Sequence, residues 1–507
     1  MNIQLNGQDG GTVQTLLTGA ALTLAFLLTL LALPALSGAA APVRLAELSV
    51  ESQNCVNCHK QDNVNVYQQW GKSKHYGANI GCYECHQADK NDPDAFKHRK
   101  GPWISTVVTP KDCARCHEKE AREFAESHHS KAGRILGSLD NILAEVVEGN
   151  RGFVTTGFPD GVSAAAANGC WQCHGSEVKV LKDDKGNNTG RLDPATWPNS
   201  GIGRINPDGS EGSCSACHQR HDFSRAQARQ PENCGKCHMG PDHPQIEVYN
   251  ESKHGINYHA NKDEMNLDST KWVVGEDYFA APTCATCHMS ATRDMPVTHN
   301  VGLRIKWNNR PVHSKLAHLT DKKWGLPSAS VTGDERRTNM ENVCLACHAK
   351  PFTDNFFTQY EALIELYDSK FATPGEALYK AATAVLKKAE GERYAKFSHK
   401  IDYTWFELWH HEGRRARHAA SMQAPDYTHW HGTYDLAKNF YSEYIPEIRE
   451  IIHDNQEGPA AKEALVLEAL LEEVLASPNH QWFIGEVSDE EQKARDNRRK
   501  EFLERYQ

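Results

Sequence analysis

The hydrophobic and polar positions divide the chain into three regions. Residues 16–36 form an almost unbroken apolar run. Residues 55–348 show no sustained hydrophobic period, and segments rich in Gly, Pro, Asn and Asp, such as residues 197–209, interrupt them. Beyond residue 348, apolar residues recur at i, i+3 and i+4 over long stretches. The pattern predicts a mainly α protein, in which short helices and loops precede a bundle of long helices.

Four long helices are predicted in the C-terminal region, over residues 361–389, 405–422, 436–455 and 460–476. We expect Pro374 with Gly375, and Gly458 with Pro459, to separate helices. The bundle is expected to pack on the preceding region or on neighbouring subunits. Residues 489–507 are highly charged and predict a solvated helix. No second apolar run reaches membrane length, so no C-terminal anchor is expected.

The N-terminal apolar run has the features of an export segment. Residues 1–43 contain neither lysine nor arginine, and small residues follow Leu36. These small residues suit signal-peptidase cleavage near Ala39 or Ala41. At roughly twenty residues, the run is also long enough to remain as a membrane anchor. We therefore expect residues 1–41 to be a signal peptide or an anchor, and the rest of the protein to be exported.

A single motif uses all the cysteine. The 507 residues include 16 cysteines, and each lies in one of eight Cys-x-x-Cys-His motifs. Two intervening residues place both thiols within reach of the two vinyl groups at one porphyrin edge, and the adjacent histidine meets the iron. Zinc sites require no histidine directly after the second cysteine. The motifs therefore predict eight covalently bound c-type haems (heme c), and no cysteine remains for disulfides or for a thiolate nucleophile.

In chain order the motifs contain Cys55, Cys58 and His59; Cys82, Cys85 and His86; Cys113, Cys116 and His117; Cys170, Cys173 and His174; Cys214, Cys217 and His218; Cys234, Cys237 and His238; Cys284, Cys287 and His288; and Cys344, Cys347 and His348.

The composition agrees with a fold built around cofactors. Hydrophobic residues make up 39% of the chain and the mean hydropathy is −0.64, which is low for a large conventional core. Haems supply the missing apolar material, so we expect an octahaem domain over residues 42–350 and a helical domain over residues 351–507. The net charge of −10 argues against a nucleic-acid-binding protein and is compatible with small basic redox partners. Covalent haem attachment also fits the bacterial periplasm.

Second axial ligands are expected among the other histidines. Eight of the 27 histidines belong to the motifs, which leaves 19. Surface histidines are an alternative for any single position, but the number is large for a globular protein of this size. Six candidates stand near a motif in a short polar context: His75, His98, His128 or His129, His221, His254 and His299. The seventh is expected to be His411 or His418, with His313 and His318 as competitors, because residues 405–434 are dense in His, Trp, Arg and Tyr.

The sequence resembles the octahaem hydroxylamine oxidoreductases (HAO) from about Cys55 to about Tyr444. The most specific part is Cys214-x-x-Cys-His-Gln-Arg-His221-Asp-Phe-Ser, followed by Pro231-Glu-Asn-Cys234-x-x-Cys-His and then by Asp242-His243 and Ser252-Lys253-His254-Gly255. Thr298-His299-Asn300 and Asp426-Tyr427-Thr also look like segments of that family.

The resemblance implies a five-coordinate catalytic haem at the fourth motif, with His174 as its proximal ligand and seven bis-histidine haems that carry electrons. It implies that Asp242 and His243 handle protons beside the nitrogen substrate, which would be hydroxylamine, nitrite or hydrazine. It also implies a homotrimer. In oxidising members a tyrosine of a neighbouring subunit is bonded to the catalytic haem, and Tyr427 matches it.

Two departures from the family bear on the direction of the reaction. The linker of residues 175–213 is longer than in the nitrifier enzymes, and a further active-site tyrosine of those enzymes falls on Phe356. Tyr427 favours oxidation of hydroxylamine to nitric oxide or nitrite. The alternative is reduction of nitrite or hydroxylamine to ammonium by a haem without the tyrosine link.

Two other classes are weighed against this enzyme. A pure electron-transfer cytochrome has eight bis-histidine irons, and its Asp242-His243 is an ordinary acidic turn with a ligand histidine. A reductase whose substrate haem is held by lysine is disfavoured because the chain has no Cys-x-x-Cys-Lys motif. The expected redox partner is a cytochrome, either soluble or membrane-bound and quinol-linked.

Overall fold

The computed structural model describes residues 47–99, 101–137, 153–154, 162–163, 169–316 and 331–507. The predicted export segment and His318 lie outside the described residues. Within them, no helix combines the length and the apolar character that a membrane span requires. Residues 48–507 form one unit of contacts.

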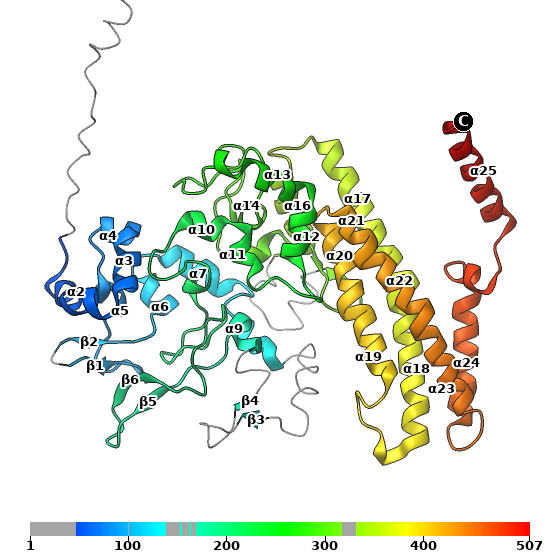
Figure 1. The fold of residues 1–507 in the computed structure, drawn as a ribbon, viewed down its shortest axis with the longest axis horizontal. Helices are drawn as coiled ribbons and strands as arrows, with labels where there is room; N and C mark the ends of the chain where they lie inside the picture. Colours follow the sequence, from blue (N-terminus) through cyan, green and yellow to red (C-terminus); the bar gives the residue numbers. More distant parts are fainter. Residues whose placement is uncertain (1–46, 100, 138–152, 155–161, 164–168, 317–330) are drawn as a thin grey trace, which may run out of the picture. The chain divides into compact units, whose positions relative to one another are not determined.

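Short helices joined by loops carry the haem motifs, as the sequence predicts (Figure 1). They are α2 (Val50–Asp62), α3 (Val64–Lys72), α4 (Lys74–Gly77), α5 (Cys82–His86), α6 (Pro110–Ala114), α7 (Glu118–Glu126), η1 (Ala132–Gly137), α9 (Trp171–His174), η4 (Cys214–Ala216), α10 (Arg225–Arg229), α11 (Pro231–Gly235), α12 (Gln245–Glu251), α13 (Lys253–Asn261), η5 (Lys262–Glu264), α14 (Cys284–Met289), η6 (Val301–Arg304) and α16 (Gly333–Cys344).

Local capping chemistry explains why such short helices form. The side chains of Thr109, Thr283 and Thr332 each accept a hydrogen bond from a backbone N–H of the first turn, at the starts of α6, α14 and α16. Proline occupies the first position of α6 and α11, where its missing N–H costs nothing. Polar caps, rather than apolar faces, therefore fix where these helices begin.

Strands are few and short, again as predicted. The described strands form antiparallel pairs: β1 (Phe96–Lys97) with β2 (Trp103–Ile104), β3 (Phe153–Val154) with β4 (Val162–Ser163), β5 (Val180–Lys182) with β6 (Asn188–Leu192), and β7 (Trp307–Asn308) with β8 (Lys315–Leu316). The β5–β6 hairpin belongs to the long linker of residues 175–213, and β6 packs against β1. The linker is therefore tied to the region of the first two motifs.

From Lys350, just after the eighth motif, long helices alternate with short helical turns. They are α17 (Lys350–Tyr367), η8 (Asp368–Ala372), α18 (Thr373–Glu390), η9 (Gly391–Arg393), α19 (Lys400–Glu407), η10 (Leu408–Glu412), α20 (Gly413–Ser421), α21 (Pro425–Tyr427), η11 (Thr428–Tyr434), α22 (Asp435–Asn439), η12 (Phe440–Tyr444), α23 (Ile445–Asp454), α24 (Ala461–Ala476), η13 (Gln481–Ile484) and α25 (Asp489–Arg505).

The expected break at Pro374 is wrong. The wide π turn η8 joins α17 and α18 into one continuous helix that passes through Pro374. A proline ring normally clashes with the carbonyl four residues earlier, here that of Lys370, but Lys370 lies in the π turn, where the backbone is wider. Pro446 follows the π turn η12 in the same way. The break at Gly458 and Pro459 is confirmed, because it lies between α23 and α24.

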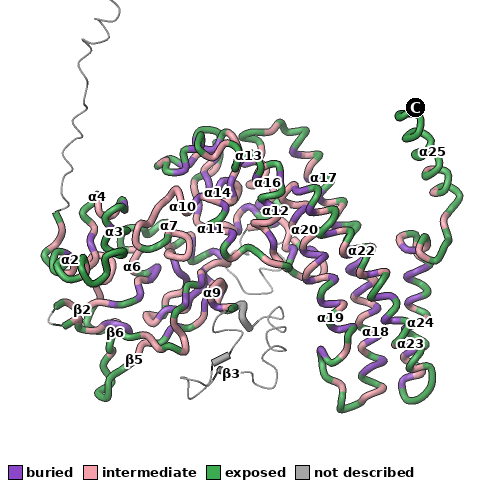
Figure 2. Tube along the Cα trace, viewed as in Figure 1, coloured by how far each residue is buried: buried purple, intermediate pink, exposed green. Residues whose placement is uncertain are grey.

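The C-terminal helices share an apolar core of their own. Helix α18 packs against α19, α23 and α24, and Leu378, Ile401, Tyr444 and Leu467 are fully buried among them. Figure 2 shows this burial along the long helices, whereas α25 is exposed and has no buried residue, as expected of a solvated helix.

Helix α20 and η11 pack closely against each other. Gly432 of η11 faces the backbone of Ala416, and a Cβ atom at Gly432 would lie 2.5 Å from the Ala416 Cα atom and 2.8 Å from its Cβ atom. Since α20 also carries Arg414 and Arg417, this contact helps to set where those side chains lie.

Gly432→Ala is therefore expected to lower the free energy of unfolding by roughly 1–3 kcal/mol, because the added methyl group must push η11 away from α20. Gly71→Ala in α3 is the matched control, since its Cβ atom would meet nothing within 4 Å. Thermal unfolding of the haem-loaded protein, followed by circular dichroism, measures the difference. Equal midpoints for the two variants would contradict the close contact.

Candidate functional site

Each Cys-x-x-Cys-His motif forms a turn that gathers its three side chains. The N–H groups of His117, His218, His238 and His348 donate to the carbonyl oxygen of the first cysteine of their motifs, at 2.8–3.0 Å. This bond spans four residues, as in one turn of helix, and places positions i, i+3 and i+4 on one face. The two thiols and the imidazole therefore point to the same side, as covalent haem attachment requires.

A second histidine ring faces the motif histidine at five motifs. Two imidazoles that bind one iron from opposite sides, each at about 2 Å, have ring centroids about 6 Å apart. The observed pairs are His59 with His98 (6.2 Å), His117 with His75 (6.2 Å), His218 with His299 (6.4 Å), His238 with His129 (6.0 Å) and His348 with His254 (6.2 Å). The residues at these motifs therefore fit bis-histidine haem.

Two of these second histidines are presented by the same local device. His75 and His254 occupy the second position of α4 and α13, and each follows a Ser-Lys pair. The hydroxyl oxygens of Ser73 and Ser252 accept from the N–H groups of Tyr76 and Gly255, at 3.1 and 3.0 Å. The short polar context that singles these histidines out in the sequence is thus a helix N-cap.

The other predicted histidines also lie at motifs. His221 is close enough to His86 for the charges of the two imidazoles to interact, and His129 interacts in the same way with His128 and His288. His128 lies beside Gly302 of η6, and η6 contacts α14, which carries His288. Both members of the His128–His129 pair, which the sequence leaves as alternatives, therefore lie among the motif histidines.

Of the other candidates for a seventh ligand, His418 is buried near His238 and His243, whereas His313 and His411 have different neighbours. His418 contacts Gln245 Nε2 through its Nδ1 atom at 2.8 Å, and it is His129 that lies opposite His238. His313 lies between Asp368 (3.7 Å) and Glu376 (3.3 Å). His411 packs against His410 and Phe406.

Contacts between cysteines give the order of the motifs in space. Thiols touch between Cys55 and Cys82, Cys113 and Cys214, Cys173 and Cys237, and Cys234 and Cys284. Cys85 also lies near Cys113, Cys217 near Cys234, and Cys287 near Cys344. The motifs therefore follow one another as first, second, third, fifth, sixth, seventh and eighth, and the fourth lies beside the sixth.

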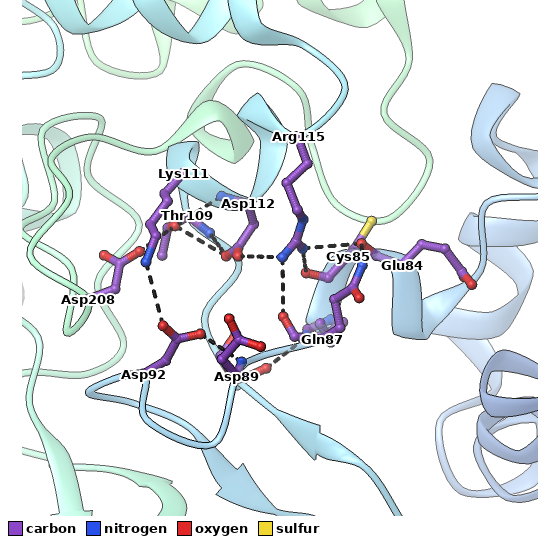
Figure 3. A network of polar contacts seen from close by, with 12 residues as sticks. Glu84, Cys85, Gln87, Asp89, Asp92, Thr109, Lys111, Asp112, Arg115 and Asp208 are labelled. Atoms are coloured by element: carbon purple, nitrogen blue, oxygen red, sulfur yellow. Dashed lines mark hydrogen bonds and ion pairs between the residues drawn. The ribbon is translucent and has the colours of Figure 1, made fainter.

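Arg115 ties the second motif to the third (Figure 3). Its guanidinium donates to the carbonyl oxygens of Glu84, Cys85 and Gln87 at 3.2–3.3 Å and pairs with Asp112 at 3.3 Å. Thr109, the N-cap of α6, also donates to Asp208 of the long linker at 2.8 Å. This polar network holds three distant segments of the chain together.

The long linker braces the fourth motif. The N–H groups of Ile202 and Gly203 donate to the carbonyl oxygens of Cys173 and His174, both at 3.0 Å. Such close approach needs glycine, because a Cβ atom at Gly201 would lie 2.0 Å from the backbone nitrogen of Gly175. Sequence reasoning missed this brace, although the Gly-Ile-Gly run of residues 201–203 is its visible signal.

Charged side chains from three segments meet beside His174. Asp242 and His243 lie in the loop before α12, and their side chains are 3.5 Å apart. Arg414 of α20 reaches Asp242 Oδ2 with Nη1 at 3.3 Å, and His410 Nε2 lies 4.0 Å from the same oxygen. The charges of Asp242, His243 and Arg310 act on His174. The Asp242–His243 pair is thus close enough to His174 for their charges to interact, and the His243 ring also lies 6.3 Å from that of His238 in the sixth motif.

The arginines of this cluster are held by backbone carbonyls. Arg414 Nε donates to the carbonyl oxygen of Arg310 at 2.8 Å. Arg417, which is fully buried, donates to the carbonyl oxygens of Gly413 (2.8 Å) and Pro311 (3.1 Å). Burial and the neighbouring Arg414 lower the pKa of His410 to about 2, so its imidazole is neutral. The guanidinium groups of Arg310 and Arg414 and the carboxylate of Asp242 are then the charged groups of this cluster beside the fourth motif. Sequence reasoning noted this dense segment but did not identify Arg310, Arg414 or His410.

Tyr427 lies in an apolar cluster of its own chain. It is 8% exposed, packs with Val248, Ala419 and Ala424, and its ring contacts His431 at 4.8 Å. Phe356, where the resemblance places a further tyrosine, packs against Phe357 and Tyr360.

A buried carboxyl group at the end of η10 makes the stability of this region depend on pH. Glu412 is 5% exposed, and burial raises its pKa to about 7 although Asn439 donates to Oε1 at 3.0 Å. A carboxyl group whose pKa is higher in the folded state than in the unfolded state stabilises the fold at low pH, and this stabilisation is lost as the pH rises between the two values.

Glu412→Gln is therefore expected to match the wild type at acid pH and to be more stable by roughly 2 kcal/mol at mildly alkaline pH, because the variant never buries a charge. The exposed Glu407→Gln is the control and is expected to show no such difference. Urea unfolding of the haem-loaded proteins across this pH range measures the difference in the free energy of unfolding between each variant and the wild type. A constant difference between Glu412→Gln and the wild type would contradict a buried, titrating Glu412.

Comparisons with known proteins agree with these features. The family described as "seven times multi-haem cytochrome CxxCH" matches residues 208–386. A curated relative from Kuenenia stuttgartiensis, named a probable nitrite reductase-hydroxylamine oxidoreductase fusion protein, is 27% identical over 334 residues. The match covers 59% of this chain and 34% of the relative, so the chain spans about a third of the length of that protein.

Two solved structures share the fold. One, titled a hypothetical multiheme protein, has a TM-score of 0.65 and 24% identity over 81% of this chain and 96% of its own. The other, a reducing HAO-like protein complex of Kuenenia stuttgartiensis, has a TM-score of 0.54 and 17% identity over 79% and 85% of the two chains. The chain thus shares the mainly α fold of these multihaem structures, and its residues 208–386 match a multihaem cytochrome family.

Proposed function

We propose that the protein is a periplasmic, homotrimeric octahaem oxidoreductase of small nitrogen compounds, and that it reduces nitrite or hydroxylamine towards ammonium at the fourth motif. The observation that carries this proposal is the charged cluster beside His174, in which Arg310 and Arg414 accompany Asp242 and His243. Two guanidinium groups against one carboxylate favour an anionic substrate such as nitrite.

The motif residues would hold the cofactors. Cys170, Cys173 and His174 would bind the catalytic haem, and the other seven motifs would bind bis-histidine haems through the facing histidines described above. Bound haems supply electron transfer and an iron that accepts the nitrogen ligand. The continuous spatial order of the motifs supports a relay, with the fourth motif joining it at the sixth through the contact of Cys173 with Cys237.

The chain's own side chains must supply the protons that the reaction consumes. Reduction of nitrite to ammonium consumes protons at the nitrogen and at its oxygens, so acid groups must stand beside the substrate. We assign that role to Asp242 and His243, because Arg414 Nη1 and His410 Nε2 approach the Oδ2 atom of Asp242 beside the fourth motif. The guanidinium of Arg414 is fixed by the carbonyl of Arg310, so it holds Asp242 in one orientation.

The surroundings of Tyr427 favour reduction over the oxidation that the sequence alone suggests. A tyrosine that bonds to the haem of a neighbouring subunit must reach out of its own subunit. The ring of Tyr427 instead packs with Val248, Ala419 and Ala424 of its own chain. A haem without the tyrosine link suits the supply of electrons to a substrate, and one solved relative is described as a reducing HAO-like complex.

The state of the fourth haem tests this direction. Mass spectrometry of proteolysed holoprotein is expected to recover the Tyr427 peptide free of haem. Electron paramagnetic resonance is expected to show one high-spin iron among low-spin irons. A haem peptide joined to Tyr427 would reverse the proposed direction to hydroxylamine oxidation, and eight low-spin irons would indicate a pure electron-transfer cytochrome.

Arg414→Gln tests the charged cluster. We expect a loss of roughly 10²–10³ in kcat/KM for nitrite, because a fixed cationic donor beside the reacting anion is removed. The KM for hydroxylamine, which is uncharged at neutral pH, is expected to change far less. Arg415→Gln is the matched control, since Arg415 pairs with Glu412 and Asp435. Equal losses for both substrates would show that Arg414 is merely structural.

A further inference from the structure

Helix α24 is apolar on two opposite sides. One side packs against α18 and α23 through Ala464, Leu467, Leu471, Val474 and Leu475. The other side carries Leu465 and Val466, which are 65% and 58% exposed, and continues through the exposed Ala469. The exposed side of α24 is therefore the kind of surface that a partner covers.

The surface continues onto α18. Ala381 and Ala384 of α18 and Lys462, Glu463 and Val466 of α24 line a shallow groove of about 140 Å³ between the two helices. Small side chains on α18 allow another helix to approach closely. Figure 2 shows that buried and exposed positions alternate along α24.

The charges on the exposed side make it complementary to itself. Lys462 stands at the start of the apolar stretch, and Glu472 and Glu473 stand at its end, all exposed. Ten residues separate Lys462 from Glu472, which is about 15 Å along a helix. When two copies of α24 lie antiparallel, Lys462 of each copy meets Glu472 and Glu473 of the other, and Leu465 and Val466 meet Ala469 between the two ion-paired ends. A surface that pairs with itself in this way is the mark of a two-fold contact.

We propose that the exposed side of α24 is a two-fold interface with a second copy of this chain, built on antiparallel pairing of α24. This proposal does not depend on the reaction proposed above. One pair of helices buries less surface than the roughly 1,200–2,000 Å² of a typical stable complex, so we expect association through this contact alone to be weak and to depend on protein concentration. It would join two protomers, or two trimers, into a particle of twice the mass.

A second segment of the chain has the chemistry to cover the exposed side of α24. The last helix, α25, ends with the exposed apolar residues Phe502, Leu503 and Tyr506 next to several arginines and lysines. Such a segment could also cover an apolar surface that ends in glutamates. The two occupants are separable, because only pairing of α24 with itself requires Lys462 to face Glu472 and Glu473.

Sedimentation velocity of the full-length, haem-loaded protein tests the proposal over a micromolar concentration series at low salt. Leu465→Glu with Val466→Glu is expected to halve the particle mass. Phe502→Glu with Leu503→Glu is the control, with the same change at two exposed apolar residues, and is expected to leave the mass unchanged. Dissociation by the α25 pair, or a wild type whose mass the α24 pair does not alter, would overturn the proposal.

A charge exchange identifies the antiparallel register. Lys462→Glu alone, and Glu472→Lys with Glu473→Lys alone, each place like charges opposite one another at both ends and are expected to weaken association about tenfold or more. An equimolar mixture of the two variants restores both ion pairs between unlike copies, so the heavy particle is expected to return. Since mixing leaves the fold of each chain unchanged, a mixture that stays dissociated counts against the proposed contact.

Discussion

The spacing between two imidazoles on opposite sides of one iron is the constraint on which the haem-bearing part of this molecule depends. At five motifs the motif histidine has a histidine ring from a distant segment of the chain 6.0–6.4 Å away. The helices that carry them are too short to be stable alone, and polar caps rather than apolar faces fix where they begin. The low mean hydropathy agrees with this, because cofactor ligation and haem surface replace much of the ordinary core.

The C-terminal half is stabilised differently, and it helps to position residues around the haem motifs. Its long helices bury a conventional apolar core, and π turns let two of them pass through prolines without a break. This rigid frame brings α20 against α12, and so places Arg414 and His410 beside the Asp242–His243 loop. The surroundings of the fourth motif are thus built from both halves of the chain: Asp242, His243 and Arg310 come from one half, and Arg414 and His410 come from the other.

Much of this was predictable from the sequence, because cysteine and histidine spacing encodes local geometry directly. The motif turns, the scarcity of strands, the long helices and most of the facing histidines follow from periodicity and from short polar contexts. The prediction of a helix break at Pro374 failed, because residue types do not reveal the π turn that precedes this proline. Arg310 and Arg414 were missed for a related reason: their role arises from contacts between segments that are far apart in the sequence. The bracing glycines of residues 201–203 have a local signal, but its meaning appears only beside Gly175.

The histidine pairs also describe how the chain must mature. The loop between His59 and His98 overlaps the loop between His75 and His117, and the span from His86 to His221 runs beyond both. The loops from His129 to His238, from His218 to His299 and from His254 to His348 continue the series without a gap. Every point between the first and eighth motifs is therefore enclosed by at least one pair, as in interlocked links. No fragment of this region closes by itself, so a single unfilled motif would leave its neighbours in the series incomplete.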